Sequence, residues 1–146
     1  MNLKFWGVRG SIPTPGIQYT KYGGNTSCVE LSVGDKIIIF DMGSGLKDLG
    51  ASIVKRKIKK FDILVSHFHY DHTCGLPFFE PAYEKEFEFS IRSAKLKTRK
   101  ETRDVLKEQM SSPSFPITID QFSASIEYKN FRIQKDLLLS DDITVT

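Results

Sequence analysis

The sequence predicts a layered α/β domain built on a mixed β-sheet. Two observations predict it: strand-like segments come first, and strands and helices then alternate. The composition agrees, because 40% of the residues are hydrophobic and 27% are charged, as in globular proteins. At 146 residues the chain is long enough for one ordinary domain.

The first elements predicted are strands. Residues 3–8 predict a strand, and the prolines and glycines of residues 9–16 predict a loop after it. Residues 28–33 and 36–40 predict two more strands, joined by Gly34 and Asp35 as a hairpin connection. The earlier of the two alternates polar and apolar residues, which indicates one solvated face. The later one is apolar and β-branched, which indicates a strand covered on both sides.

Helices and strands alternate after this hairpin. Apolar residues at helical spacing in residues 46–57 predict the first helix. An apolar strand at residues 61–66 leads directly into a cluster of histidines. We expect a short proline-interrupted helix at residues 76–83, a strand at 86–92 and a charged helix at 98–110. Further strand candidates are residues 125–128, 131–133 and 143–146.

The composition also bears on the compartment. The longest apolar run, residues 37–40, is far shorter than the roughly 18 residues that a membrane span needs. Residues 1–5 lack the apolar stretch of a secretory signal. Two cysteines, Cys28 and Cys74, make no disulfide framework and fit a reducing compartment. We therefore expect a cytoplasmic protein with no membrane partner.

The net charge of +3 comes largely from two basic stretches, residues 55–60 and 92–107. The first could attract phosphate or nucleic acid, but cations at the end of a helix are the simpler interpretation. No aromatic residues interleave with these lysines to stack on bases. We therefore expect a small-molecule substrate, and a nucleic acid is the less favoured alternative.

All three histidines of the chain lie in one six-residue segment, residues 67–72. His67 and His69 are two positions apart, so at the end of an extended strand they project from the same face. Asp71 and His72 follow where the chain turns, at the carboxyl end of a strand, where α/β sheets bind ligands. Imidazole and carboxylate groups suit zinc, manganese or iron better than calcium or magnesium. We expect two divalent metal ions, because one zinc ion cannot easily take all four groups and keep a water.

Two other interpretations of this cluster are a patch of surface polar residues and a structural zinc site. Structural sites are usually cysteine-rich and closed, and here a buried strand leads into the cluster. The pattern therefore favours a catalytic metal site.

The segment His-Phe-His-Tyr-Asp-His at residues 67–72 has the HxHxDH pattern and resembles the metallo-β-lactamase superfamily. Residues 40–45 resemble the Asp-x-Gly turn of that fold, and residues 5–13 and 22–28 resemble its phosphodiesterase-like branch. The resemblance covers about residues 3 to 92 well. It implies an αββα sandwich, here its N-terminal part with a mixed sheet and flanking helices, and a dinuclear site at the sheet edge.

The resemblance implies that His67 and His69 bind the first metal ion and that Asp71 and His72 bind the second, with Asp71 also catalytic. Family members take a third histidine, a bridging aspartate and a last histidine from later segments. No histidine follows His72 in this sequence. We therefore expect a domain truncated at its C-terminus, covering residues 1–146, with little or no activity of its own.

Five further residues are candidates. Arg9 and Ser11 could line a phosphate pocket beside the metals, and Asn25 and Thr26 could donate hydrogen bonds there; all four could equally serve to build the glycine-rich loops. Asp41 could accept backbone N–H bonds of its glycine turn or orient a metal-binding histidine.

The function expected is hydrolysis of a phosphodiester, a cyclic nucleotide being one instance, by a hydroxide that bridges the two metal ions. One alternative is a thioester or lactam hydrolase of the same fold. Another is a non-catalytic remnant that binds metal or a partner protein. Self-association into a homo-oligomer is also expected, because a missing half would leave part of the sheet uncovered.

Overall fold

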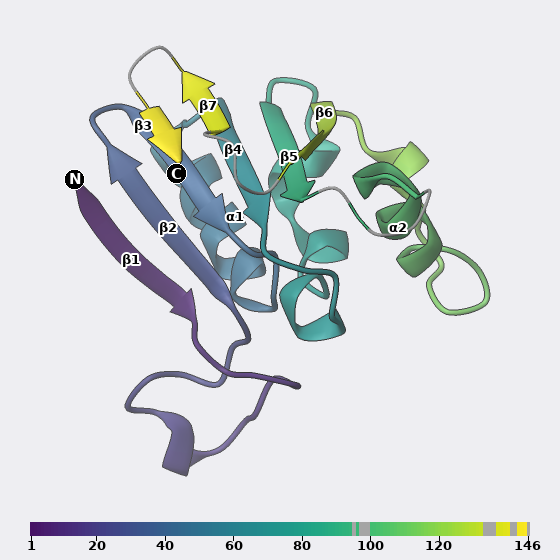
Figure 1. Cartoon of the computed structure of the whole chain (residues 1–146). Coiled ribbons are helices and arrows are strands. Elements are labelled where there is room, and N and C mark those ends of the chain that lie inside the picture. Colours follow the sequence, from purple (N-terminus) through teal and green to yellow (C-terminus); the bar gives the residue numbers. More distant parts are fainter. Residues whose placement is uncertain (95, 97–99, 133–136, 141–142, 146) are drawn as a thin grey trace.

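The computed structural model describes residues 1–94, 96, 100–132, 137–140 and 143–145. Its centre is a six-stranded mixed sheet, accompanied by two α-helices and a small hairpin (Figure 1). The sheet strands, in spatial and in sequence order, are β1 (Asn2–Gly7), β2 (Cys28–Val33), β3 (Lys36–Phe40), β4 (Lys60–Val65), β5 (Glu88–Ala94) and β6 (Ser125–Phe131). The remaining elements named are α1 (Gly45–Arg56), α2 (Thr102–Gln109), β7 (Leu137–Ser140) and β8 (Ile143–Val145).

The strand directions decide where a functional site can form. β1, β2 and β3 are antiparallel neighbours, whereas β3, β4, β5 and β6 all run parallel. The carboxyl ends of these four parallel strands therefore meet at one edge of the sheet, which is the usual ligand-binding edge of α/β sheets. Asp41 follows β3 and His67 follows β4 at this edge.

One hydrophobic core joins the sheet to both helices. Ile39 of β3 and Ile63 of β4 are fully buried with Leu49 of α1 and Leu106 of α2. The rings of Phe61 and Phe89, on neighbouring strands, stack at a centroid distance of 4.8 Å. Burial of these apolar side chains is the main stabilising contribution, at about 25 cal/mol per Å² removed from water.

The side of β2 that carries Glu30 faces helix α1. Glu30 is 2% exposed, and its carboxylate accepts hydrogen bonds from Arg56 of α1 and from the Trp6 indole. Leu31 points the other way and is only half-buried, and on the neighbouring strand Phe5, on that same side, is 61% exposed. One side of residues 28–33 is therefore more exposed than the other, as predicted, but it is the side that carries the apolar residues. A buried ion pair lets an acidic residue face the core, which alternation alone does not predict.

Most predicted elements are confirmed, with shifted bounds. The predicted helix at residues 76–83 is two 3₁₀ turns, Leu76–Phe78 and Glu80–Tyr83, each with a proline in its first turn. α2 begins at Thr102, where Glu101 and Asp104 form a capping box; residues 98 and 99 of the predicted helix lie outside the described part.

Corrections are larger at the C-terminal end. The candidates at residues 125–128 and 131–133 belong to one strand, β6, which runs through to Phe131; residue 133 lies outside the described part. β7 was not predicted, and it pairs with β8, which occupies the predicted strand 143–146 up to Val145. Among the described helices, none has both the length and the apolar character needed to cross a membrane.

Candidate metal centre

The site begins with Asp41, the first residue after β3. Its backbone N–H donates to the carbonyl of Leu64 on β4 (2.9 Å), and its φ of 63° lies in the left-handed region. This conformation is uncommon for a residue with a side chain, although aspartate and asparagine tolerate it best. The turn directs the carboxylate to the start of the segment that follows β4, where Ser66 and His67 lie.

The Asp41 carboxylate is buried, and each of its two oxygens has two hydrogen-bonding partners. Oδ1 accepts the N–H and the hydroxyl of Ser66, both at 2.8 Å. Oδ2 accepts the hydroxyl of Ser27 at 3.0 Å and lies 2.8 Å from Nδ1 of His72. The contact with His72 favours a proton on Nδ1, which leaves the Nε2 lone pair available to a metal ion.

The histidine segment is held against the turn after β3 by backbone contacts. The N–H of Met42 donates to the carbonyl of His72, and the N–H of Gly75 donates to the carbonyl of Met42, both at 2.8 Å. A Cβ added to Gly43 would lie 2.4 Å from the carbonyl oxygen of Asp71. The absence of a side chain at Gly43 thus allows the two segments to touch.

The three imidazole rings gather at this edge. The ring centroid of His67 lies 4.5 Å from that of His69 and 4.1 Å from that of His72. His67 and His69 are exposed, whereas the side chain of His72 is 19% exposed. The Ser66 hydroxyl lies 3.1 Å from Nδ1 of His67, so one serine contacts both Asp41 and a histidine.

Asp71 completes the group from the other side. Its Oδ2 lies 3.4 Å from Nε2 of His72 and accepts the backbone N–H of Ser11 at 2.8 Å. The Ser11 hydrogen bond, with a smaller contribution from the charge of His72, lowers the pKa of Asp71 below its ordinary value. The hydrogen bond therefore favours the ionised carboxylate, which is the form that binds a metal ion.

The donor set fits divalent metals that accept nitrogen and oxygen ligands. Within the described residues, however, no three histidine, cysteine, aspartate or glutamate side chains are arranged around one common point. These described residues therefore form no complete set of ligands for one ion. His67 with His69 and Asp71 with His72 remain the predicted pairs.

A cleft of about 510 Å³ lies beside the histidines. His67 and His69 line one side, and Ser93, Val105 and Lys100 are among the residues that line the rest. Nζ of Lys100 contacts Glu108 at 2.7 Å at the same cleft. This volume is in the range of small-ligand sites, so a substrate group can lie next to the predicted metal ligands.

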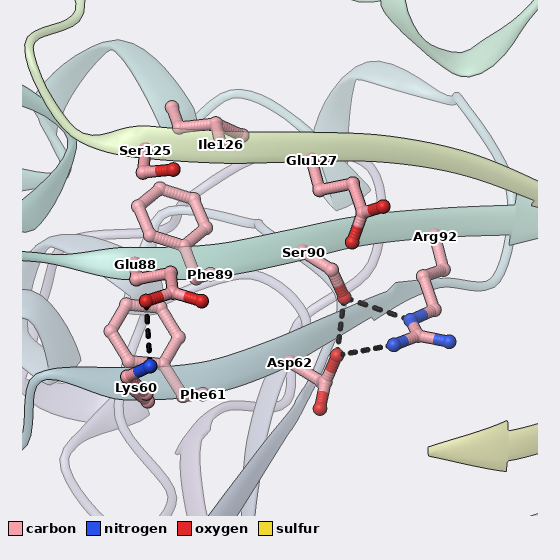
Figure 2. A pocket seen from close by; sticks show the side chains of 10 residues that line it. All are labelled: Lys60, Phe61, Asp62, Glu88, Phe89, Ser90, Arg92, Ser125, Ile126 and Glu127. Carbon is pink, nitrogen blue, oxygen red and sulfur yellow. Dashed lines mark hydrogen bonds and ion pairs between the residues drawn. The ribbon is translucent and has the colours of Figure 1, made fainter. Parts of the chain in front are cut away.

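A second cleft, of about 600 Å³, lies on the first halves of β4, β5 and β6, away from the histidines (Figure 2). Two ion pairs lie within it: Lys60 contacts Glu88 at 2.7 Å, and Arg92 donates to Asp62 at 3.0 Å. Ser90 bridges the last two, donating to Asp62 and accepting from Arg92. The cleft contains no histidine and is not a candidate metal site.

Three loop candidates make contacts away from the histidines. Asn25 donates to Asp48 of α1 (3.1 Å), and buried Thr26 accepts the N–H of Ser44 (2.8 Å), just before α1. Arg9 donates to the carbonyl of Gly23 (3.0 Å). These contacts build the loop, and a role of the three residues in substrate binding stays a prediction. Ser11, in contrast, contacts the centre directly through its backbone.

Two serines of the centre, Ser27 and Ser66, were not among the candidates. Ser66 could have been found, because it is the last residue of the predicted strand and directly precedes His67. Ser27 is brought to Asp41 only by the pairing of β2 with β3, which the chain order alone does not reveal.

Known proteins that share sequence with this chain are ribonucleases. It is 37% identical over 75 residues to ribonuclease Z of Pyrococcus horikoshii, covering 50% of this chain and 22% of the relative. It is 25% identical over 134 residues to ribonuclease Z of Haloarcula marismortui, covering 85% of this chain and 38% of the relative. The chain thus spans less than half the length of these relatives, and no family model matches it.

Solved structures give the fold. The metallo-β-lactamase fold protein YhfI from Bacillus subtilis matches 93% of this chain and 48% of its own, with a TM-score of 0.59 and 15% identity. The chain has the N-terminal part of the metallo-β-lactamase fold. Human tRNase Z, short form, agrees, with a TM-score of 0.54 and 19% identity over 91% of this chain and 47% of its own. The expected fold class is therefore confirmed.

The metallo-β-lactamase fold was predicted correctly, but the expected partner was not. The curated relatives are ribonucleases by name, so their substrate is RNA. The expectation that favoured a small-molecule substrate over a nucleic acid was wrong. It rested on the lysines of residues 55–60, and a basic stretch without aromatic residues says nothing about other surfaces of the domain.

Proposed function

We propose that this chain belongs to a metal-dependent hydrolase that cleaves phosphodiester bonds of RNA. One observation carries the proposal: His67, His69, Asp71 and His72 gather at the carboxyl edge of the parallel strands, with His72 oriented by Asp41. The ribonuclease Z relatives support a phosphodiester as the bond that is cleaved and a nucleic acid as the substrate. The geometry of these four residues alone would also suit a thioester or a lactam as the substrate.

Two divalent ions, zinc or else manganese or iron, are the cofactors proposed. His67 and His69 would hold one, and Asp71 and His72 the other. Bound ions of this kind activate water as a nucleophile and neutralise charge on phosphate oxygens. The chain's own contribution is to hold the ligands: Asp41 contacts Nδ1 of His72, which leaves Nε2 on the side of Asp71, and the Ser11 N–H holds the Asp71 carboxylate by a hydrogen bond.

The cleft of about 510 Å³ beside His67 and His69 is the proposed seat of the nucleotide next to the scissile phosphate. Val105 supplies apolar surface for a base or sugar, and Lys100 lies at the same cleft with a positive charge. Arg9 is the proposed phosphate contact on the loop side. We expect slow turnover, because four ligands supply only two groups to each ion.

The test is to incubate the chain with millimolar Zn²⁺ or Mn²⁺ and three substrates: a labelled RNA oligonucleotide, a cyclic nucleotide and a thioester. We expect RNA cleavage above the rate with metal alone, and its loss in His69→Ala. Lys85→Ala, an exposed residue at the opposite edge of the parallel strands, is the control. Preferential thioester hydrolysis, or metal binding without RNA cleavage, would contradict the proposal.

A further inference from the structure

We propose that the N-terminal loop, defined as residues 8–27 between β1 and β2, binds single-stranded nucleic acid and leads it to the histidine cluster. This inference rests on the proposed function and assigns it a substrate-binding surface. Five observations carry it: the charge of the loop, its exposed aromatic rings, its closed backbone, the pocket within it and its contact with Asp71.

The charge of the loop suits a polyanion. Residues 8–27 contain Arg9 and Lys21 and no acidic residue; the first acidic residue of the chain is Glu30. The side chain of Arg9 makes one hydrogen bond, from Nε to the carbonyl of Gly23, which leaves its terminal nitrogens without a protein acceptor in the part that the structure describes. Lys21 has no carboxylate partner among the described residues and lies over the ring of Tyr22. Both cations can therefore contact phosphates.

Aromatic rings stand next to these cations. Tyr22 is 66% exposed, with Nζ of Lys21 at 5.0 Å from its ring centroid. Tyr19 is half-buried, with the guanidinium of Arg9 at 4.8 Å from its centroid. Alternating rings and cations are what proteins use to bind single strands, because bases stack on the rings while the phosphates contact the cations. Residues 55–60, in contrast, have cations without rings.

The loop is closed by its own backbone. The N–H of Thr14 donates to the carbonyl of Gly24, and the N–H groups of Val8 and Arg9 both donate to Asn25, at 2.9–3.0 Å. A Cβ on Gly24 would lie 2.1 Å from the carbonyl oxygen of Thr14, so the two arms of the loop are in direct contact. Tyr19 and Tyr22 are thus presented by a compact loop, and less entropy is lost on binding than with an open one.

A pocket of about 340 Å³ lies within the loop. Its lining includes Thr14, Tyr19, Thr20 and Asn25, together with prolines and glycines. The hydroxyl of Thr14 is buried and, among the described residues, is the one buried side-chain oxygen or nitrogen without a hydrogen-bond partner. A nucleobase seated here can stack on Tyr19 and satisfy this hydroxyl.

The position of the loop connects it to the metal centre. It extends beyond the sheet at the edge where β3, β4 and β5 end (Figure 1). Ser11, within the loop, donates its N–H to Asp71 at 2.8 Å. A strand bound along the loop therefore runs toward the histidine cluster.

Binding is tested without catalysis, by fluorescence anisotropy of a labelled oligo-uridylate with the full chain in EDTA. Tyr22→Ala should weaken binding about fivefold or more, and Tyr22→Phe should retain it, because the ring and not the hydroxyl stacks. Lys21→Ala should reduce the slope of log affinity against log salt by about 0.7, the value for one single-strand phosphate contact.

Two controls match these changes. Phe5→Ala removes a ring of similar exposure from β1, and Lys85→Ala removes an exposed cation from the opposite edge; neither should alter binding. Thermal unfolding by circular dichroism checks that each variant is folded. Equal affinity of wild type and Tyr22→Ala, an equal loss in Phe5→Ala, or no binding of the wild-type chain would overturn the inference. The proposed function fails separately, through absent RNA cleavage by a chain that still binds the strand.

Discussion

Oδ2 of Asp41 lies 2.8 Å from Nδ1 of His72, so the residue that follows β3 orients a histidine 31 positions further along the chain. The same carboxylate accepts the N–H and hydroxyl of Ser66, directly before His67. Asp41 therefore couples both ends of the histidine segment to the sheet. This arrangement places a histidine with a defined tautomer at the ligand-binding edge before any metal binds.

The first prediction is that Asp41→Asn weakens Zn²⁺ binding by about 10–100-fold, the usual effect of losing a partner of a metal-bound histidine. Asparagine tolerates the left-handed conformation of residue 41, so the backbone turn should persist. Zn²⁺ titration by calorimetry measures the effect. Asp48→Asn, which alters an exposed carboxylate on α1, serves as the control. Equal affinity in Asp41→Asn and wild type would show that Asp41 has no part in the metal site.

A second prediction separates ligands from neighbours. His67→Ala and His69→Ala should each lower the metal content far more than Cys28→Ala. Cys28 is fully buried, and burial raises the pKa of its thiol well above the ordinary value, so it offers no thiolate. Elemental analysis after dialysis gives the metal content. An unchanged content in His69→Ala would remove His69 from the proposed ligands.

The histidine segment was predictable because its ligands are adjacent in the sequence and follow a strand whose apolar run identifies it. The supporting groups were harder to predict, because they depend on which strands are neighbours. Ser27 reaches Asp41 through the pairing of β2 with β3, and Ser11 reaches Asp71 across 60 positions. Local periodicity contains no information on such contacts. For the same reason, the alternation of residues 28–33 does not show that Glu30 faces the core through its ion pair with Arg56.

A third prediction concerns the pKa of Asp71. The Ser11 N–H stabilises the ionised carboxylate, so the pKa in metal-free protein lies below the ordinary value of about 3.9. Ser11→Pro removes this donor and should raise the pKa toward that value. Ser11→Gly keeps the donor, suits the φ of 69°, and should leave the pKa low. Carbon-13 NMR titration of the carboxyl groups gives the three values. Similar values in the Pro and Gly variants would contradict the assigned cause.

A fourth prediction concerns acid stability. Burial raises the pKa of Glu30, but hydrogen bonds from Arg56 and Trp6 outweigh burial and lower the pKa below its ordinary value. The ion pair therefore stabilises the fold above the pKa of unfolded glutamate, about 4.3, and this contribution is lost as the pH falls through the lower folded pKa. Glu30→Gln should reduce the free energy of unfolding by about 1–2 kcal/mol at neutral pH and flatten its decline in acid. Urea unfolding across this range measures both.

The control for this prediction is Glu88→Gln. Glu88 pairs with Lys60 on the surface, with 59% and 75% of the two side chains exposed, and exposed pairs contribute about 0–1 kcal/mol. The free energy of unfolding of Glu88→Gln should therefore decline in acid as it does in the wild type. If the free energy of unfolding of Glu30→Gln fell with pH as steeply as that of the wild type, the pair of Glu30 with Arg56 would not set the pH dependence.

The last prediction uses two glycines to test whether the histidine segment depends on close packing against the turn after β3. A Cβ at Gly43 would lie 2.4 Å from the Asp71 carbonyl oxygen and 2.5 Å from Oγ1 of Thr26, whereas one at Gly10 would meet nothing within 4 Å. Gly43→Ala must therefore push the histidine segment away from the turn. Overpacking of this kind costs about 1–3 kcal/mol, and the displacement should weaken metal binding as well. Gly10→Ala adds the same methyl group on the loop and should change neither quantity. Urea unfolding and Zn²⁺ titration of the two variants measure the difference. If Gly43→Ala bound Zn²⁺ as tightly as Gly10→Ala, the four ligands would not require the contact between the two segments, and the position of His72 would depend on Asp41 alone.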